Sequence, residues 1–417
     1  MGLNRPNLQN SNPRNKVARL RVDSPMKSRT TALIPAYLDN VAKLILFIGT
    51  LWGSDLDGQE SSRLPRPQEP MEPLPYRSER VRFKNTQAGI ELAGTLTIPH
   101  THTPSPAIVL VTGSGPQDRD ETIANHKPFL ILADHLTRRG IAVLRYDDRG
   151  VGDSGGDFET ATMLDFVSDG KAAVKFLKNR TDIAPKRIGL LGHSEGGMVL
   201  PEVAIALPGE VSFLVLLASP GLNGQAIFYL QDAVQQRARG DTEDSIERSK
   251  QRKAQMFAVL KDEPDLDKAA RKLRKTMKSM RLLPEEAKAL KASGVSLDTI
   301  INQQIQLLNN DATRFFLSYD PLPALKQLEV PVLALTGERD LQVPPKENLP
   351  LIRAALSGGE CPLYSVAELP KLNHLFQTCE SGLPEEYTQI QETFAPMALH
   401  KISEWIPMAL SKTLLKE

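Results

Sequence analysis

The feature that most constrains the fold is a series of short apolar runs separated by segments long enough to form helices. The runs occupy residues 107–113, 141–147, 187–193, 211–219 and 331–338, with a weaker one at 361–370. Continuous apolar runs of this length are typical of strands buried on both faces of a parallel sheet. Helix-length segments at 125–139, 161–178, 195–207 and 346–357 lie between most of them. This alternation predicts an α/β fold with a mostly parallel, doubly wound sheet.

Two regions depart from this alternation. Residues 80–85 and 90–99 alternate apolar and polar side chains, which predicts two antiparallel strands. Between residues 219 and 331 no comparable strand occurs. That interval is rich in Gln, Lys, Arg and Leu, and it predicts helices at 225–239, 242–260, 266–280 and 296–309. We therefore expect a core formed by residues 78–221 and 319–417, with residues 222–318 as a helical cap. A basic run in the cap, from Lys268 to Arg281, is interpreted as a solvent-exposed helix face, and attraction of anionic substrates is the alternative.

The N-terminal residues have a different composition. Residues 1–30 contain seven basic residues and one acidic residue, and we interpret them as a disordered leader. Residues 31–54 form an apolar segment, but its uninterrupted part, 44–52, is shorter than the ~20 residues that span a bilayer. This pattern predicts a signal peptide or an anchor, with weak membrane association through 44–52. We favour an exported or membrane-anchored protein over a cytoplasmic one. Residues 55–77, which are rich in proline, are interpreted as a linker.

Composition excludes several kinds of chemistry. The chain contains 51 Lys and Arg against 50 Asp and Glu, so no nucleic-acid partner is expected from its net charge of +1. Two cysteines are too few for a cysteine-only zinc site, and the seven histidines lack the H-E-x-x-H spacing. We therefore expect no metal and no cofactor, and chemistry that depends on ordinary side chains.

The strand at 187–193 leads directly into the sequence Gly192-His-Ser-Glu-Gly196 and then into a predicted helix. A serine at a sharp strand-to-helix turn has a strained backbone, and glycines two positions before and after it remove steric crowding. The turn also directs the N-terminus of the helix at the serine, which favours developing negative charge. The pattern predicts Ser194 as a nucleophile. A second match, Gly152 to Gly156, lies in a polar, glycine-rich loop and is interpreted as structural.

A serine nucleophile needs a base, and the base needs an orienting carboxylate. His374 follows the last predicted strand, and it is the predicted base. Asp340 follows the strand at 331–338 and is the predicted orienting acid, with Glu338 as the alternative. The order Ser194, Asp340, His374 is the order expected on this fold. His193, although next to the serine, is expected to point into the packing.

The oxyanion formed during attack needs backbone donors. The N–H of Glu195 is one candidate. Ser114, in the loop after the strand at 107–113, is the other, with Gly115 as the alternative. An anionic Glu195 side chain near the oxyanion would oppose catalysis. We therefore expect this side chain to point away and to pair with a cation or a hydrogen-bond donor.

From residue 78 to 417 the chain resembles bacterial serine carboxylesterases of the α/β-hydrolase superfamily. The segments that carry the resemblance are GSGPQDRDE, YDDRGVGDSGG, GHSEGG and LNHLFQ, together with the helical cap. The resemblance implies cofactor-free hydrolysis of short- to medium-chain acyl esters. It assigns Ser194, Asp340 and His374 as the triad, with Ser114 and Glu195 as oxyanion donors. The strand before the oxyanion loop reads VTG where many relatives have HG.

We therefore expect a serine hydrolase that acts on a small-molecule ester through an acyl-enzyme. A peptidase or amidase, or an acyltransferase or thioesterase, with the same triad is the alternative, and the oligomeric state stays open. Cys361 and Cys379 lie on either side of His374 in the sequence. They are a candidate disulfide in an oxidising compartment, and two buried thiols are the alternative.

Overall fold

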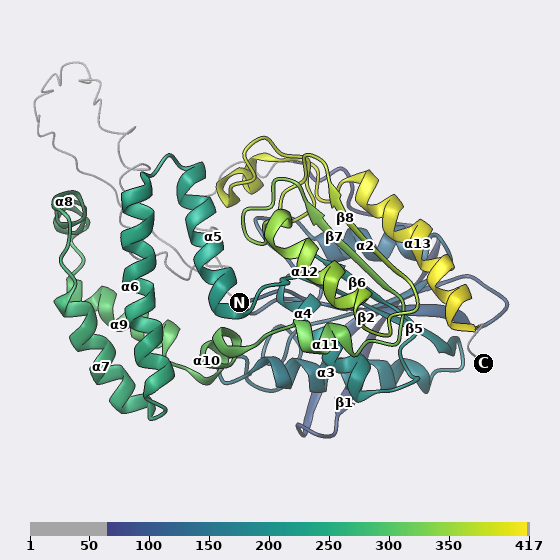
Figure 1. The fold of residues 1–417 in the computed structure, drawn as a ribbon. Coiled ribbons are helices and arrows are strands. Elements are labelled where there is room, and N and C mark those ends of the chain that lie inside the picture. Colours follow the sequence, from purple (N-terminus) through teal and green to yellow (C-terminus); the bar gives the residue numbers. More distant parts are fainter. Residues whose placement is uncertain (1–64, 415–417) are drawn as a thin grey trace, which may run out of the picture.

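The structure is a computed structural model that describes residues 65–414 (Figure 1). The predictions for the leader at 1–30, for the apolar segment at 31–54 and for the first part of the linker lie outside the described residues. In residues 65–414 no helix is both long and apolar enough to cross a lipid bilayer.

The core is an eight-stranded sheet with the order β1-β2-β4-β3-β5-β6-β7-β8. β1 pairs antiparallel with β2, and β2 with β4, whereas all pairs from β4 to β8 are parallel. The expected mostly parallel sheet is thus confirmed. The strands are β1 (Tyr76–Asn85), β2 (Ile90–Pro99), β3 (Ser105–Val111), β4 (Ala142–Tyr146), β5 (Ile183–His193), β6 (Leu214–Leu217), β7 (Val332–Gly337) and β8 (Tyr364–Leu369).

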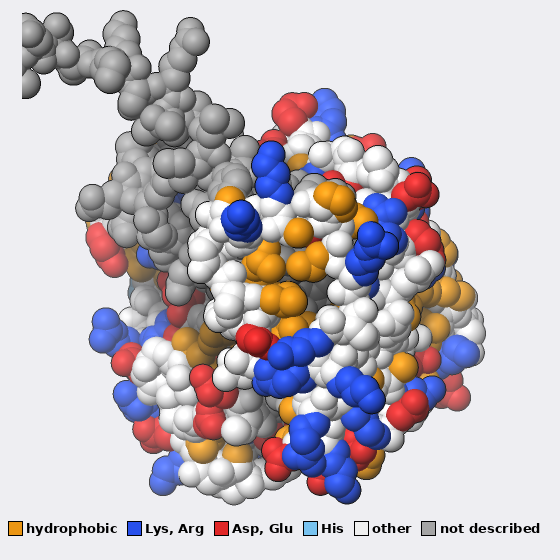
Figure 2. All heavy atoms as spheres, turned by 90° about the vertical axis from the view of Figure 1, so that its left-hand side faces the viewer, with side chains coloured by type: hydrophobic (Ala, Val, Ile, Leu, Met, Phe, Trp, Pro, Cys, Tyr) orange, Lys and Arg blue, Asp and Glu red, His pale blue; other side chains and the backbone are white. Residues whose placement is uncertain are grey.

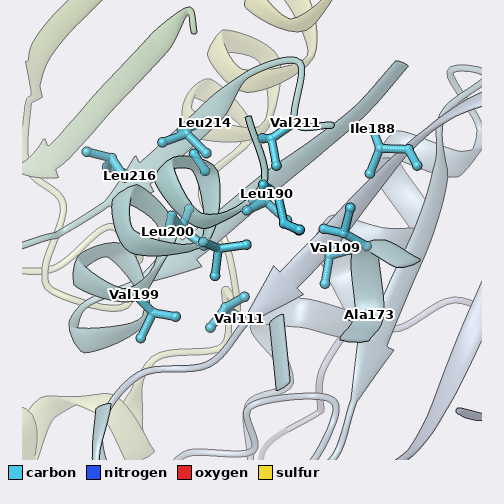
Figure 3. Packing of buried hydrophobic residues seen from close by; sticks show 14 of the residues in the cluster. Val109, Val111, Ala173, Ile188, Leu190, Val199, Leu200, Val211, Leu214 and Leu216 are labelled. Atoms are coloured by element: carbon cyan, nitrogen blue, oxygen red, sulfur yellow. The ribbon is translucent and has the colours of Figure 1, made fainter. Parts of the chain in front are cut away.

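Helices cover both faces of the sheet. Successive side chains of a strand point to opposite faces, so each strand contributes to two apolar layers. One layer joins Val109 and Leu190 to α3, α4 and α12, and Figure 3 shows part of it around Val199 and Leu200. The other layer packs against α2 and α13. The helices are α2 (Pro128–Thr137), α3 (Met163–Lys178), α4 (Glu195–Ala206), α11 (Leu322–Lys326), α12 (Pro345–Ser357) and α13 (Pro396–Leu414), with a 3-10 helix η2 (Pro384–Gln389).

The cap lies between β6 and β7 and stands to one side of the sheet (Figure 1). Four helices were expected in the cap, and the structure has six between residues 222 and 318. The two additional short helices, α8 and α10, begin after Leu283 and after Asn310, whose side chain accepts a hydrogen bond from the N–H of Thr313. The cap has its own apolar cluster, which includes Phe228, Phe257 and Leu273. Its helices are α5 (Gly224–Ala238), α6 (Glu243–Asp262), α7 (Leu266–Ser279), α8 (Pro284–Ser293), α9 (Leu297–Leu308) and α10 (Asp311–Ser318).

Most of the basic run of the cap lies on α7. Leu273 of that helix is buried, whereas Lys272 and Lys278 are exposed and pair with Glu263 and Asp298 at 2.8 and 2.7 Å. Figure 2 views the molecule from the cap side and shows Lys and Arg interspersed with Asp and Glu around a patch of hydrophobic side chains. This arrangement is that of a solvated helix face.

Part of the segment expected to be a linker is anchored to the core. The Arg66 guanidinium donates to the backbone carbonyls of Ala124 and Asn125 at 3.1 and 3.2 Å. The Gln68 side chain donates to the carbonyl of Phe394 at 2.7 Å and accepts from the N–H of Thr393 at 2.6 Å. These contacts hold the chain before β1 against the segment that leads into α13.

Candidate active site

Ser194 occupies the turn between β5 and α4, with φ 52° and ψ −119°. A positive φ is strained for any residue other than glycine and persists only where the surroundings impose it. The neighbouring glycines make the turn possible. A Cβ at Gly192 would lie 2.4 Å from the carbonyl oxygen of Gly196, and one at Gly196 would lie 2.4 Å from that of Val111. The glycine spacing therefore has the steric cause that the sequence indicated.

His374 and Asp340 come together at the carboxyl ends of β8 and β7. The Nδ1 atom of His374 lies 2.8 Å from Oδ2 of Asp340, and both side chains are buried. The other oxygen of Asp340 accepts the N–H groups of Gln342 and Val343, each at 2.8 Å, which fixes the carboxylate. The alternative acid, Glu338, instead accepts the N–H of Lys371 at 2.8 Å. The hydrogen bonds thus place Asp340, and not Glu338, on the imidazole.

The turn that carries Ser194 is connected to the loop of His374 by a hydrogen bond from the neighbouring residue, His193. The Nε2 atom of His193 lies 3.0 Å from the carbonyl oxygen of His374, and the centres of the two rings are 4.7 Å apart. Within residues 65–414, the hydroxyl of Ser194 makes no hydrogen bond to His374. Catalytic hydrogen bonds of this kind are often long without substrate and shorten in the complex. The structure therefore brings the three elements together but leaves the serine–histidine contact open.

The predicted oxyanion loop passes directly beside the nucleophile. A Cβ at Gly113 would lie 3.3 Å from the Cβ of Ser194. Ser114 and Gly115 line the same pocket as Glu195. The hydroxyl of Ser114 donates to Oε2 of Glu195 at 2.7 Å, so the Glu195 side chain pairs with a hydrogen-bond donor. Desolvation raises the pKa of Glu195 and outweighs the opposing effect of the Ser114 hydrogen bond, which favours an uncharged side chain beside the oxyanion.

Thr112 directly precedes Gly113, at the start of the predicted oxyanion loop. Its hydroxyl donates to Oδ1 of Asp148 at 2.7 Å, and the N–H of Gln117 donates to Oδ2 of Asp148 at 3.0 Å. Burial raises the pKa of Asp148 well above its ordinary value. Thr112 thus ties the oxyanion loop to the loop after β4.

The pocket beside the site has walls from the core and from the cap. Phe166 and Val199 lie on the core side, and Phe228 and Phe316 on the cap side. The pocket lining also includes the polar residues Ser114, Glu195 and Asp148. A pocket with apolar walls and a few polar groups is typical of a small-molecule site. Polar and apolar atoms share the lining of this pocket, and Glu195, the neighbour of Ser194, belongs to it, whereas Ser194 and His374 do not. In the part of the chain that the structure describes, no group of three His, Cys, Asp or Glu residues is placed to hold a metal ion.

The second G-x-S-x-G match lies away from these residues. The hydroxyl of Ser154 donates to the carbonyl of Asp147 at 2.7 Å and accepts the N–H of Ala93 at 2.9 Å. These bonds hold the loop after β4 against β2. The structural interpretation of this motif agrees with the contacts that its serine makes.

Sequence reasoning missed Glu121. Its Oε1 atom accepts the N–H of Gly113 at 2.7 Å and lies 2.9 Å from Nδ1 of His193. His193 does point into the packing, as expected. Glu121 gave no signal in the sequence, because it is one of several charged residues in the loop that follows β3.

The candidate disulfide between Cys361 and Cys379 is wrong, because both residues are free thiols. Cys361 precedes β8, and its thiol contacts the carbonyl of Val330. Cys379 lies past the other end of β8, and its N–H bonds the carbonyl of Lys371. The six residues of β8, about 20 Å of extended chain, lie between the places where the two cysteines bond, whereas a disulfide requires Cα atoms closer than ~7 Å.

The strand order, the serine in the turn after β5 and the histidine–aspartate pair are those of the α/β-hydrolase fold. Residues 126–289 match the family described as serine aminopeptidase, S33; the match includes Ser194 and ends before Asp340. Esterase EstD from Thermotoga maritima is 40% identical over 129 residues, which are 31% of this chain and 30% of EstD. The chain thus spans less than a third of the length of that relative.

Two solved structures align with the chain at low sequence identity. The esterase Pf2001 from Pyrococcus furiosus aligns with a TM-score of 0.47 and 15% identity, covering 84% of this chain and 99% of its own. A proline iminopeptidase from Mycobacterium smegmatis aligns with a TM-score of 0.45 and 16% identity, covering 81% of this chain and 100% of its own.

Proposed function

We propose that the protein is a serine hydrolase that cleaves carboxylic esters with short- to medium-length acyl chains. The observation that carries the proposal is the buried hydrogen bond between Nδ1 of His374 and Oδ2 of Asp340. It leaves Nε2 of His374 free to act as a base, at the sheet edge where Ser194 is held in a strained turn. The apolar pocket walls suit an acyl chain.

The reaction follows from these groups. Ser194 attacks the ester carbonyl while His374 accepts the hydroxyl proton, and Asp340 stabilises the imidazolium that forms. The backbone N–H groups of Ser114 and Glu195 are the proposed donors to the oxyanion. Each such donor typically contributes about 3 kcal/mol to the transition state. His374 returns its proton to the departing alcohol, and a water molecule, deprotonated by the same histidine, then hydrolyses the acyl-enzyme.

Peptidase activity is the second candidate, because the matching family is described as a serine aminopeptidase. Amide and ester hydrolysis use the same groups, so the two activities are separated by assay: p-nitrophenyl esters against amino-acid p-nitroanilides, at equal enzyme concentration. An acyltransferase or thioesterase stays a further alternative from the sequence, tested with alcohol acceptors and with thioester substrates.

The decisive experiment compares Ser194→Ala with Ser154→Ala in the full chain. Both serines lie in a G-x-S-x-G match, and Ser154 is the control. We expect Ser194→Ala to lose p-nitrophenyl ester turnover and fluorophosphonate labelling, while Ser154→Ala retains both in its folded fraction. Labelling that persists in Ser194→Ala would place the nucleophile elsewhere.

A further inference from the structure

We propose that His193 and Glu121 form a second buried pair that positions both the catalytic His374 and the oxyanion loop, with His193 held as an imidazolium. The inference rests on the proposed function. It gives roles to two residues that the hydrolytic steps do not use, and that touch neither substrate nor the reacting atoms. Both are therefore positioning residues.

Glu121 contacts both His193 and the start of the predicted oxyanion loop. Its side chain is buried, and a single oxygen, Oε1, accepts from the N–H of Gly113 and faces Nδ1 of His193, at 2.7 and 2.9 Å. Its backbone has φ 53°, a left-handed conformation that is unfavourable for glutamate. A strained backbone in a buried acid indicates that the surrounding loop imposes this position. Because Gly113 precedes Ser114, Glu121 fixes the start of the loop that carries a proposed oxyanion donor.

The partners of His193 determine its charge. Nε2 lies 3.0 Å from the carbonyl oxygen of His374, and a carbonyl can only accept a hydrogen bond. Nδ1 faces the carboxylate of Glu121, which can also only accept when ionised. With Glu121 ionised, both ring nitrogens donate, and the ring is then an imidazolium. The pKa of His193 is raised accordingly: burial lowers it and is the largest single effect, but the Glu121 carboxylate, the carbonyl of His374 and Asp340 together outweigh burial.

A comparison with His126 supports this assignment. His126 is buried to a similar extent, but its Nδ1 faces the hydroxyl of Thr393 at 2.9 Å, and its Nε2 faces the carbonyl of Tyr387 at 2.9 Å. A hydroxyl can donate as well as accept, so a neutral ring satisfies both contacts. Burial lowers the pKa of His126 to about 4.

The charged pair has two consequences for the site. Nε2 of His193 makes a charge-assisted hydrogen bond to the backbone of His374, which holds the histidine loop in place. The imidazolium also lies beside the His374 ring, with 4.7 Å between the ring centres, and it places a positive charge next to the proposed base. Three groups act on His193 electrostatically from the elements packed around it: Glu121, the carbonyl of His374 and Asp340.

The experiment compares His193→Gln and Glu121→Gln in the full chain, with His126→Gln as a buried-histidine control. Turnover is expressed per fluorophosphonate-labelled Ser194, so unfolded protein does not count. We expect both test variants to lose at least about tenfold in kcat, with KM within about threefold, because misplacement of catalytic groups by less than 1 Å costs rate. The control should retain kcat per labelled site.

The pH profile separates positioning from simple stabilisation. In His193→Gln the cation is lost and the Glu121 carboxylate stays near the proposed base, so the acid limb of kcat/KM moves to higher pH by at least about half a pH unit. In Glu121→Gln, His193 gives up its proton, the local net charge is unchanged, and the limb stays in place. The proposal would be overturned if both variants lost thermal stability but kept the wild-type kcat, and if His193→Gln kept the acid limb of the wild-type pH profile.

A measurement on the unmodified chain covers the case in which the variants do not fold. Histidine ¹⁵N spectra of the wild type at pH 8 should show one imidazolium that resists deprotonation, whereas unperturbed histidines are neutral there. Absence of that signal would overturn the proposal. A wild-type chain that shows this imidazolium but neither hydrolyses esters nor labels at Ser194 would refute the proposed function, and would leave His193 and Glu121 as a structural pair.

Discussion

Asp340 contacts His374 through one carboxylate oxygen and two backbone N–H groups through the other. The 2.8 Å contact to Nδ1 fixes the tautomer of the imidazole, because Nδ1 must carry a proton to donate. The contacts to Gln342 and Val343 keep the carboxylate from rotating away. The geometry of the base is therefore set before any substrate arrives.

We expect Asp340→Asn to lower kcat by about 10³- to 10⁴-fold, since an amide donor at this position selects the wrong tautomer. Steady-state kinetics with a p-nitrophenyl ester measures the loss. The matched control is Glu338→Gln, because Glu338 also follows β7 but bonds the backbone of Lys371. Its kcat should stay within a few-fold of wild type, and equal losses in both variants would contradict the assignment of Asp340.

Glu195→Gln should change the dependence of stability on pH. Because burial raises the pKa of Glu195 in the folded chain above its ordinary value of 4.5, the folded chain binds more protons than the unfolded chain between these two values. The contribution of Glu195 to the free energy of unfolding is therefore fully present below pH 4.5. It falls as the pH rises through this window, by up to about 1.4 kcal/mol for each pH unit. The Glu195→Gln variant lacks this pH dependence of stability, because the glutamine side chain does not titrate.

The measurement is the Tm difference between Glu195→Gln and wild type, taken at pH 4.5 and at pH 8. We expect the difference to become more favourable to the variant at the higher pH. Glu247→Gln, on an exposed position of α6, is the control, and its difference should not change with pH. A constant difference for Glu195→Gln would show that its carboxyl group is ordinarily solvated.

Phe316→Ala should shift substrate preference towards longer acyl chains. Phe316 lines the pocket from α10, and its ring lies 6.1 Å from that of Phe228. Removing the ring opens apolar space, and one methylene group in such a pocket is worth about tenfold or more in kcat/KM. A panel of p-nitrophenyl esters measures the change. Phe315→Ala, on the same helix but stacked on Tyr319, is the control and should keep the wild-type preference.

Thiol counting should find two free thiols per chain. Protein unfolded in denaturant without reductant should react with two equivalents of a disulfide reagent, since Cys361 and Cys379 lie at opposite ends of β8. A result of no reactive thiols would contradict the structure and restore the disulfide.

The sheet was predictable because buried parallel strands leave a simple signal. The run at 331–338, for example, contains β7 with every residue buried. The positions of Ser194 and His374 were predictable for a related reason: each follows a strand, and these strands end at the same edge of the sheet. Boundaries inside the cap were harder, because α8 and α10 are short, with 10 and 8 residues.

Residues whose roles depend on the conformation of a loop, and on which part of the fold that loop contacts, could not be predicted from the sequence. Glu121 contributes only because its backbone turns into a left-handed conformation and brings the carboxylate to His193. The candidate disulfide between Cys361 and Cys379 was suggested by closeness in the sequence, which is no measure of closeness in the fold. Their positions on either side of His374 in the sequence say nothing of the strand that separates them in space. Phe228 and Phe316 reach the pocket from different cap helices, which only tertiary packing reveals.

The position of the cap in the chain has a consequence for folding. β6 and β7 are neighbours in the sheet, with Leu214 opposite Val332, yet all six cap helices lie between them in the sequence. Closing such a long loop costs entropy that grows only with the logarithm of its length, about 0.6 kcal/mol for each doubling. Lengthening or trimming the cap should therefore leave the closure of the sheet nearly unaffected. Asp340 and His374, which follow the cap in the sequence, would keep their positions at the sheet edge where Ser194, which precedes the cap, also lies.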